Sequence, residues 1–178
     1  MANKVYVATS IDGFIADKDG GIDWLHDIPN PTGSDYGFND FMNSIDALIM
    51  GRNTYEKVLS FGCDWPYTKK VFVLSKTLKN VAPSLTDKVE ILSGDLEKIV
   101  GRLKNEGYQS LYIDGGKVIQ DFLANNLIDE LTITQIPILL GDGISLFGVL
   151  PKKIKLTHSS TEVLDGGMVK SRYLVRKK

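Results

Sequence analysis

The sequence predicts an α/β domain in which strands and helices alternate and the chain ends in an antiparallel hairpin. Short continuous apolar runs, such as residues 47–50, are typical of strands buried on both faces of a sheet. Apolar side chains at helical spacing follow several of these runs. The dipeptide Asp165-Gly166 between the last two apolar stretches favours a tight β-hairpin.

Runs rich in β-branched, leucine and aromatic residues between turn-forming residues define the predicted strands. In chain order they cover residues 5–10, 47–50, 70–75, 89–92, 110–114, 129–139, 154–162 and 168–176. A polar, glycine-rich loop over residues 12–33 follows the first strand, and we expect it to close over a ligand site as a lid.

Four helices are predicted between these strands. Residues 38–45 place apolar side chains at i, i+3, i+4 and i+7, which gives one apolar helical face. A short helix over 53–59 follows the second strand. The third helix has Asp95 as its expected N-cap and Gly107 as its C-terminal stop, and the fourth covers 117–125.

Length and composition describe one ordinary globular domain over residues 1–178, with 43% hydrophobic and 24% charged residues. A net charge of -1 gives no electrostatic footprint for nucleic acid or an anionic membrane, so neither is an expected partner. A small molecule is the expected partner instead.

A lone cysteine, Cys63, cannot form an internal disulfide, which suits a reducing compartment. Because His26 and His158 are the two histidines of the chain, no metal site is predicted. The N-terminus lacks the long apolar core of a signal peptide, and no apolar stretch is long enough to span a bilayer. We therefore expect a cytoplasmic protein.

Two glycine turns follow predicted buried strands and open helices. Gly115 and Gly116 allow a sharp turn close to a ligand, and the next helix offers free N–H groups for a pyrophosphate. Gly51 precedes Arg52, whose guanidinium can clamp a phosphate, and Thr54, which can donate its hydroxyl. The alternatives are a tight turn without a ligand and a surface arginine at an ordinary helix start.

Leu74, Ser75 and Lys76 form a third such place, where a strand end carries a hydroxyl and a cation. A solvated strand end is the alternative. All three places lie at carboxyl ends of predicted strands, which line the ligand crevice of open α/β sheets. The spacings of the Rossmann fingerprint and of the Walker loop are both absent.

As a set, these motifs resemble the dihydrofolate reductase superfamily, and more closely the reductase domain of the bacterial riboflavin-pathway bifunctional deaminase–reductase. The resemblance covers nearly the whole chain. The most specific match is Asp114-Gly115-Gly116 with the stretch from Leu127 to Phe147, which favours the riboflavin-type branch. Residues 7–16 look like the riboflavin-type first strand and loop, and residues 46–55 look like the strand and turn shared by both branches. Residues 73–75 are similar to the next cofactor strand.

The resemblance implies a three-layer fold, with a central mixed, mostly parallel sheet flanked by helices, and NADPH lying across the strand ends. It places Arg52, Lys76 and Ser75 at the 2′-phosphate, Thr54 and the helix after Gly116 at the pyrophosphate, and Ala8 and Ile15 at the nicotinamide. The implied cofactor-binding residues are Ala8, Ile15, Gly51, Arg52, Thr54, Leu74, Ser75, Lys76, Gly115 and Gly116.

For the substrate, the resemblance points to Asp35 as the catalytic carboxylate, with Thr134 as its partner and Trp24 as a substrate-binding aromatic. Such a carboxylate would lie in an apolar pocket that keeps its proton available. The alternative for Asp35 is a helix N-cap. Residues 56–66 contain no arginine, where the riboflavin branch carries one for the sugar phosphate.

The leading hypothesis is an NADPH-dependent reductase of a pteridine- or pyrimidine-like heterocycle. The second is reduction of the riboflavin-pathway aminouracil, 5-amino-6-(5-phosphoribosylamino)uracil. A third is a nucleotide-binding protein without turnover. The riboflavin-type resemblance also implies a homodimer, to which an apolar strand over residues 133–140 would contribute.

Overall fold

The structure of the chain is a computed structural model that describes residues 2–176. Its strands are β1 (Ala2–Ser10), β2 (Phe14–Ala16), β3 (Ala47–Gly51), β4 (Lys70–Leu74), β5 (Val89–Leu92), β6 (Ser110–Asp114), β7 (Glu130–Ile136), β8 (Ile144–Ser145), β9 (Leu156–Val163) and β10 (Val169–Val175). Its α-helices are α1 (Phe38–Asn43), α2 (Arg52–Ser60), α3 (Leu96–Asn105) and α4 (Gly116–Ala124).

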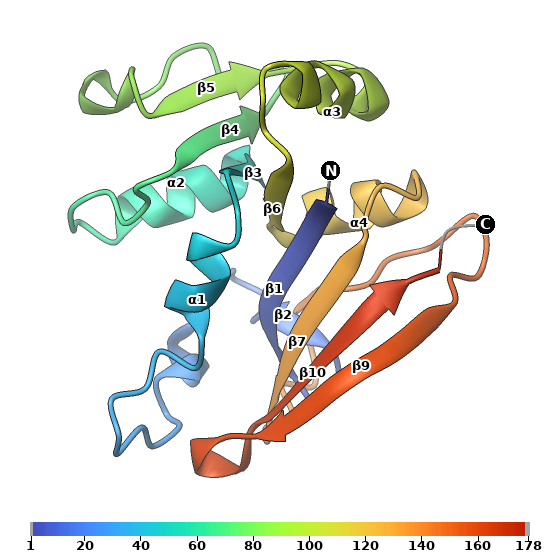
Figure 1. Ribbon diagram of the computed structural model, residues 1–178. Helices are drawn as coiled ribbons and strands as arrows, with labels where there is room; N and C mark the ends of the chain where they lie inside the picture. Colours follow the sequence, from blue (N-terminus) through green and yellow to red (C-terminus); the bar gives the residue numbers. More distant parts are fainter. Residues whose placement is uncertain (1, 177–178) are drawn as a thin grey trace.

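Within these residues, eight strands form one sheet in the order β5-β4-β3-β6-β1-β7-β10-β9. The pairs β5–β4, β4–β3, β3–β6, β6–β1 and β1–β7 are parallel, whereas β10 runs antiparallel to both β7 and β9. The sheet is therefore mixed and mostly parallel, as predicted. Figure 1 shows the final hairpin, β9 and β10, at one side of the sheet.

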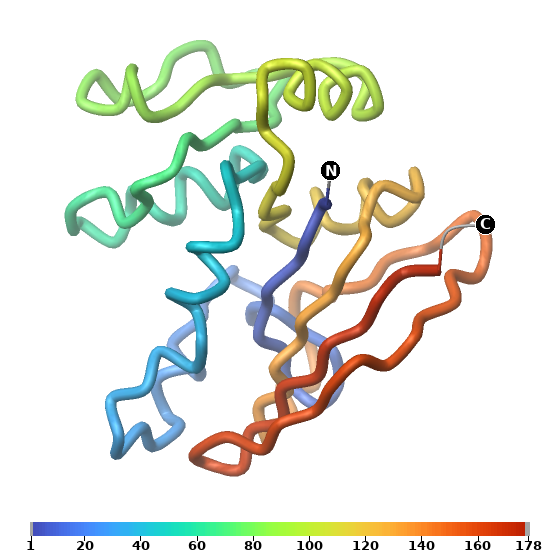
Figure 2. The backbone as a smooth tube through the Cα atoms, viewed as in Figure 1, coloured from blue at the N-terminus to red at the C-terminus, as the bar shows by residue number. Residues whose placement is uncertain are grey.

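The helices cover the sheet in two layers. Phe41 of α1 and Tyr55 of α2 pack with Leu48 and Tyr112 on one face, which we call the α1 face. The α3 and α4 helices pack on the opposite face, which we call the α4 face. Figure 2 shows the chain leaving β1 at the centre, running out to β5 at one edge, and returning through β6.

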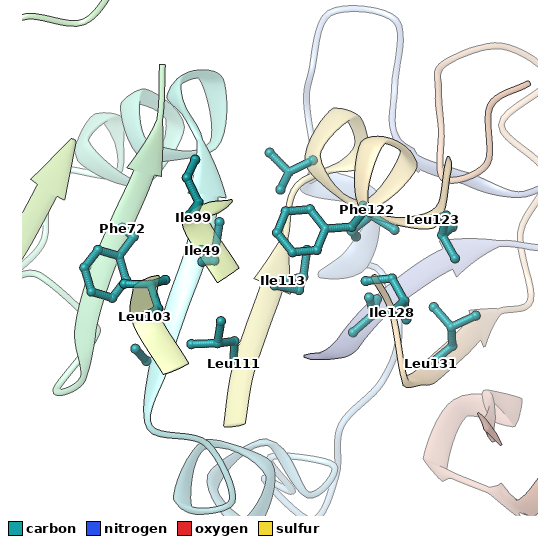
Figure 3. Close-up of a cluster of buried hydrophobic side chains, with 14 of the residues drawn as sticks. Ile49, Phe72, Ile99, Leu103, Leu111, Ile113, Phe122, Leu123, Ile128 and Leu131 are labelled. Carbon is teal, nitrogen blue, oxygen red and sulfur yellow. The ribbon is translucent and has the colours of Figure 1, made fainter. Parts of the chain in front are cut away.

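Apolar side chains between the sheet and the α3 and α4 helices form the larger core. Figure 3 shows Phe72 of β4 beside Leu103 of α3, and Ile113 of β6 beside Phe122 of α4. All four side chains are fully buried. Burial of one such side chain stabilises a fold by about 1.5–3 kcal/mol, so this layer fixes the strand ends that carry the site.

Most predicted elements are confirmed with small shifts at their ends. The Asp95 carboxylate accepts a hydrogen bond from the Lys98 amide at the start of α3, and Gly107 adopts a positive φ of 101° just after that helix. The predicted turn before β10 is present as a short 3-10 helix over Asp165–Gly167. None of the helices in the described part of the chain is long and apolar enough to cross a membrane.

The predicted strand over residues 129–139 is shorter than expected, because β7 ends at Ile136. Pro137 follows and has no N–H to donate to a strand ladder. The chain then turns, and the Ile138 carbonyl accepts a hydrogen bond from the Ile11 amide. Residues 133–140 are therefore not one strand, and β7 lies inside the sheet between β1 and β10.

A small second sheet was not predicted. It pairs β2 with β8 in an antiparallel ribbon. These segments are three and two residues long, and their paired residues, such as Ala16 and Ile144, are 128 or more positions apart in the chain. A short strand whose partner is so distant leaves no periodic pattern from which to predict it.

Candidate functional site

The carboxyl ends of β3, β4 and β6 lie side by side at one edge of the sheet. Gly51 of β3 is level with Leu74 of β4, and Met50 is level with Asp114 of β6. The connection that leaves β1 runs toward β3, while the connection that leaves β6 runs toward β7. Such a reversal between neighbouring strands marks the ligand crevice of an open α/β sheet.

The two glycine turns meet at this edge. Gly115 has a φ of +87°, and a Cβ added there would overlap the Thr54 hydroxyl. A Cβ added at Gly116 would lie 2.7 Å from Cδ1 of Ile15. Gly115 and Gly116 have no side chains, so the backbone of this turn can approach Thr54 and Ile15 closely.

Arg52 extends from the start of α2 toward the end of β4. Its guanidinium donates a 3.1 Å hydrogen bond to the Thr77 hydroxyl and lies 3.7 Å from the Glu56 carboxylate. The Ser75 hydroxyl accepts hydrogen bonds from the Thr77 and Leu78 amides and so shapes the turn after β4. Lys76 in this turn is exposed.

These groups have the chemistry that a dinucleotide phosphate requires. A close backbone turn, the N-terminus of the nine-residue α4 helix and the Thr54 hydroxyl suit a pyrophosphate. Arg52 and Lys76 on the neighbouring strand ends suit a further phosphate. The residues present therefore fit NADPH, and the structure brings together the glycine turns that the sequence places apart.

The first part of the predicted lid is tied down. The Asp12 carboxylate accepts hydrogen bonds from the Leu140 and Gly141 amides, at 3.2 and 2.8 Å. Hydrogen bonds from Ser10 and from these amides lower the pKa of Asp12. The β2–β8 ribbon adds to this tie, so any lid motion would have to come from the residues after Ala16.

Asp35 does not lie in an apolar pocket, so that expectation is wrong. Its side chain is exposed, and the carboxylate accepts 2.9 Å hydrogen bonds from the Gly37 and Asn39 amides. These backbone hydrogen bonds lower the pKa of Asp35. Gly37 is the N-cap residue of α1, so the N-cap alternative does not hold for Asp35 either; its carboxylate instead binds the amides of this cap and of the first turn from two residues further back. Its proton is held less readily than that of an ordinary aspartate.

Thr134 and Ala8 lie level with each other on β7 and β1 and face the α1 face of the sheet. Thr134 is buried, and Ala8 packs in one cluster with Trp24. The indole Nε1 of Trp24 is buried without a hydrogen-bond partner among the described residues. The structure thus gathers these three predicted residues, and Trp24 offers an unused donor beside Ala8.

Asp114 is a functional candidate whose role the sequence motifs do not predict. It ends β6 directly before Gly115, and one carboxylate oxygen accepts a 2.8 Å hydrogen bond from the Gly115 amide. Burial raises the pKa of Asp114 above its ordinary value, although this hydrogen bond offsets part of the effect. A carboxyl that keeps its proton to higher pH, at the switch point of the sheet, suits proton transfer.

Two tyrosines, Tyr112 and Tyr67, lie near this carboxyl on the α1 face, and Tyr6 adjoins Tyr112. The Tyr112 hydroxyl donates a 2.9 Å hydrogen bond to the Tyr6 carbonyl. Burial raises the pKa of Tyr112 and Tyr67, and the charge of Asp114 raises both further. Tyr67 comes from the loop after α2 and packs against Trp65. We call Tyr6, Tyr67 and Tyr112 the phenol cluster.

A cavity of about 330 Å³ lies elsewhere, on the α4 face of β1, β7 and β10. Its lining includes Thr9, Gln135, Phe147, Ser171 and Tyr173. It is separated from Asp114 by the sheet itself, so it is not part of the strand-end site. Within residues 2–176, no group of three or more histidine, cysteine or acidic side chains is placed to hold a metal ion.

Comparison with known proteins places this geometry in a family. Residues 4–170 match the RibD C-terminal domain family. The chain belongs to this family. A relative from Bacillus subtilis (strain 168), the uncharacterized protein YwjB, is 36% identical over 160 residues, which cover 89% of each chain.

Solved structures agree with this assignment. A candidate riboflavin biosynthesis protein of Shewanella sp. PV-4 is 48% identical, with a TM-score of 0.97 over 99% of this chain and all of that one. Dihydrofolate reductase of Enterococcus faecalis, solved with NADP(H) and RAB-propyl, is 18% identical, with a TM-score of 0.67 over 99% and 97% of the two chains. The predicted dihydrofolate-reductase-like fold and its riboflavin-type branch are confirmed.

Proposed function

We propose that this RibD C-terminal domain protein is an NADPH-dependent reductase of a pyrimidine-like heterocycle. The observation that carries the proposal is the close approach of Gly115 to Thr54 and of Gly116 to Ile15, at the switch point and beside Arg52. Membership of the family, and the NADP(H) complex of the dihydrofolate reductase with the same fold, support this assignment.

Residues on one side of the strand ends bind the cofactor, and residues on the α1 face bind the heterocycle. Arg52, Lys76 and the N-terminus of α4 bind the phosphates of the cofactor. When bound, NADPH supplies the hydride. Ala8 and Ile15 hold the nicotinamide ring, and the α1 face near Thr134 receives the heterocycle. The buried indole N–H of Trp24 is a donor for a ring carbonyl.

Asp114 is the best placed group to anchor or protonate the heterocycle. It lies beside the glycine turn that holds the cofactor, and its raised pKa keeps a proton available at higher pH than an exposed aspartate can. We propose Asp114 for this role in place of Asp35, whose carboxylate already accepts two backbone hydrogen bonds at the start of α1.

A pair of glycine variants tests cofactor binding. Gly115→Ala forces a Cβ against the Thr54 hydroxyl and should abolish measurable NADPH binding by calorimetry. Gly101→Ala, on α3 with open space around it, is the matched control and should bind NADPH as the wild type does. Thermal melting of both variants establishes that they fold. Equal NADPH binding by the two variants would refute the placement of the cofactor.

Turnover is tested by following the loss of NADPH absorbance with dihydrofolate and with the riboflavin-pathway aminouracil, side by side. Oxidation of NADPH with either compound supports a reductase and ranks the two substrate classes. Tight NADPH binding without oxidation by any pteridine or pyrimidine would favour the alternative, a nucleotide-binding protein without turnover.

A further inference from the structure

We propose that the substrate of this site is a heterocycle without a phosphate or carboxylate tail, because carboxylates and phenols surround its side of the strand ends while the phosphate-binding groups lie on the cofactor side. This inference rests on the reductase function proposed above. It concerns which heterocycle derivatives the α1 face accepts, and it separates them by charge.

Acidic groups face this side from several elements: Asp114 at the end of β6, Asp35 before α1, and Glu162 on β9. The raised pKa of Asp114 favours its neutral form, so the negative charges of this side are those of Asp35 and Glu162. The Tyr6 phenol lies near Asp35 and Glu162. Burial raises the pKa of Tyr6, and the charges of these two carboxylates raise it further. Burial is the larger cause of this shift, and the two carboxylates near the phenol add to it; a further anion placed beside them would be repelled by both.

Lys170 of β10, level with Thr134, lies nearest the strand ends among the cations of this face of β10, and two of its three donors are engaged. Arg172, two residues further along β10, is paired with Glu130 at 2.6 Å. The Lys170 ammonium lies 2.9 Å from the Glu162 carboxylate and donates a 2.8 Å hydrogen bond to the Tyr36 carbonyl. The Tyr6 hydroxyl donates to the same carbonyl, at 2.7 Å. Lys170 thus holds the loop before α1 in place, and its charge is balanced by Glu162.

The backbone donors at the start of α1 are also occupied. Helix N-termini bind phosphates through free amide N–H groups. Here the Asp35 carboxylate accepts from the Gly37 and Asn39 amides, so the protein's own anion occupies that position. A phosphate placed there would meet Asp35 at short range.

The loop between α2 and β4 adds aromatic surface and no arginine. Trp65 packs against Tyr55 and Tyr67, at ring distances of 5.8 and 5.3 Å. Lys57 of α2 lies over the Phe61 ring, at 5.9 Å from its centre. This segment therefore presents stacking surface for a planar ring, whereas Arg52 and Lys76 lie beyond it at the cofactor phosphates.

The inference is tested with a matched pair of compounds, 5-amino-6-(5-phosphoribosylamino)uracil and the same molecule without its phosphate. We expect kcat/KM for NADPH oxidation to be higher for the unphosphorylated compound by about tenfold, which corresponds to ~1.4 kcal/mol of differential binding. A preference for the phosphorylated compound would overturn the inference while supporting the reductase function.

Calorimetry on the NADP⁺-loaded protein gives a second readout that does not need turnover. Binding of the unphosphorylated compound, with weaker or undetected binding of its phosphate, supports the inference even where no NADPH is oxidised. Equal or tighter binding of the phosphorylated compound overturns it, and so does the absence of binding by both.

Glu162→Gln tests the charge argument directly, because it leaves the Lys170 ammonium without its carboxylate. We expect the phosphorylated compound to gain about threefold to tenfold in affinity over the unphosphorylated one, an effect expected of one charge–charge contact at a partly exposed site. Glu97→Gln, in the first turn of α3 on the other face, is the matched control. An equal change for both compounds in Glu162→Gln would overturn the argument.

Discussion

Replacing Arg52 by alanine should weaken NADPH binding and leave NADH binding almost unchanged. The guanidinium lies just after the carboxyl end of β3 and reaches the Thr77 hydroxyl in the turn that follows β4. The 2′-phosphate, which distinguishes NADPH from NADH, is the group that this arginine would hold. The sequence offers no acid in these motifs to claim a free 2′-hydroxyl.

The magnitude follows from the environment of the side chain. A hydrogen bond to a charged group contributes about 1.5–3 kcal/mol. Arg52 is 45% exposed, and on binding it exchanges its contact with Glu56 for one with phosphate, so the lower end applies. A loss of about 1.5 kcal/mol corresponds to roughly a tenfold higher Kd for NADPH. We expect the Kd for NADH to change by less than about twofold.

The assay is titration calorimetry of both cofactors against the wild type, Arg52→Ala and Lys57→Ala. Lys57 lies on the same helix but over the Phe61 ring, so its removal takes away the same charge without touching the strand ends. Equal losses for NADPH and NADH in Arg52→Ala, or an equal loss of NADPH affinity in Lys57→Ala, would refute the assignment of Arg52 to the 2′-phosphate.

Four further predictions concern Asp114, Asp12, Asp35 and the oligomeric state. Asp114→Asn should lower kcat/KM about a hundredfold or more and remove its fall at high pH. The folded state raises the pKa of Asp114, so ionisation of this group destabilises the folded protein increasingly as the pH rises above the ordinary aspartate pKa. Asp114→Asn removes this destabilisation and should therefore raise Tm at neutral pH but not in acid. Asp12→Ala should speed hydrogen exchange at the Leu140 and Gly141 amides, and a wild-type exchange rate would argue against that tie. Asp35→Asn should leave kcat/KM and Tm nearly unchanged, whereas Asp35→Ala should lower Tm; a large fall in kcat/KM for Asp35→Asn would restore its catalytic role. Light scattering at micromolar concentration should give the mass of a homodimer, and a monomer mass would contradict it.

The order of the main elements could be predicted from the sequence because it depends on local patterns. Apolar runs such as residues 47–50 and the helical spacing after Asp95 are set by neighbours in the chain. The end of β7 could have been placed correctly from Pro137, since proline has no N–H for the strand ladder. The β2–β8 ribbon could not, because its pairing joins segments that are far apart in the sequence.

The cofactor side was predictable for the same reason. Gly51 with Arg52 and Gly115 with Gly116 each follow a buried strand, and parallel strands bring their carboxyl ends to one edge. The contact between Gly115 and Thr54 follows from that arrangement. Their roles in binding NADPH stay a prediction for the calorimetry proposed above.

The substrate side differs because burial, rather than spacing, decides what a carboxylate can do. Asp35 has the sequence position of a catalytic acid, yet backbone amides saturate it at the surface and lower its pKa. Asp114 looks in the sequence like a turn residue before two glycines, yet burial at the end of β6 desolvates it and raises its pKa, although hydrogen bonds from Gly115 and Tyr112 offset part of the effect. One signal was available, because Asp114 lies two residues after Tyr112 on a buried strand and therefore on the same face of the sheet; Tyr112 is level with Leu48 and Asp114 with Met50 on β3. In a parallel sheet whose ligand lies at the strand ends, an acidic residue at the end of a buried strand is a better candidate for the catalytic carboxylate than an acidic residue in a loop.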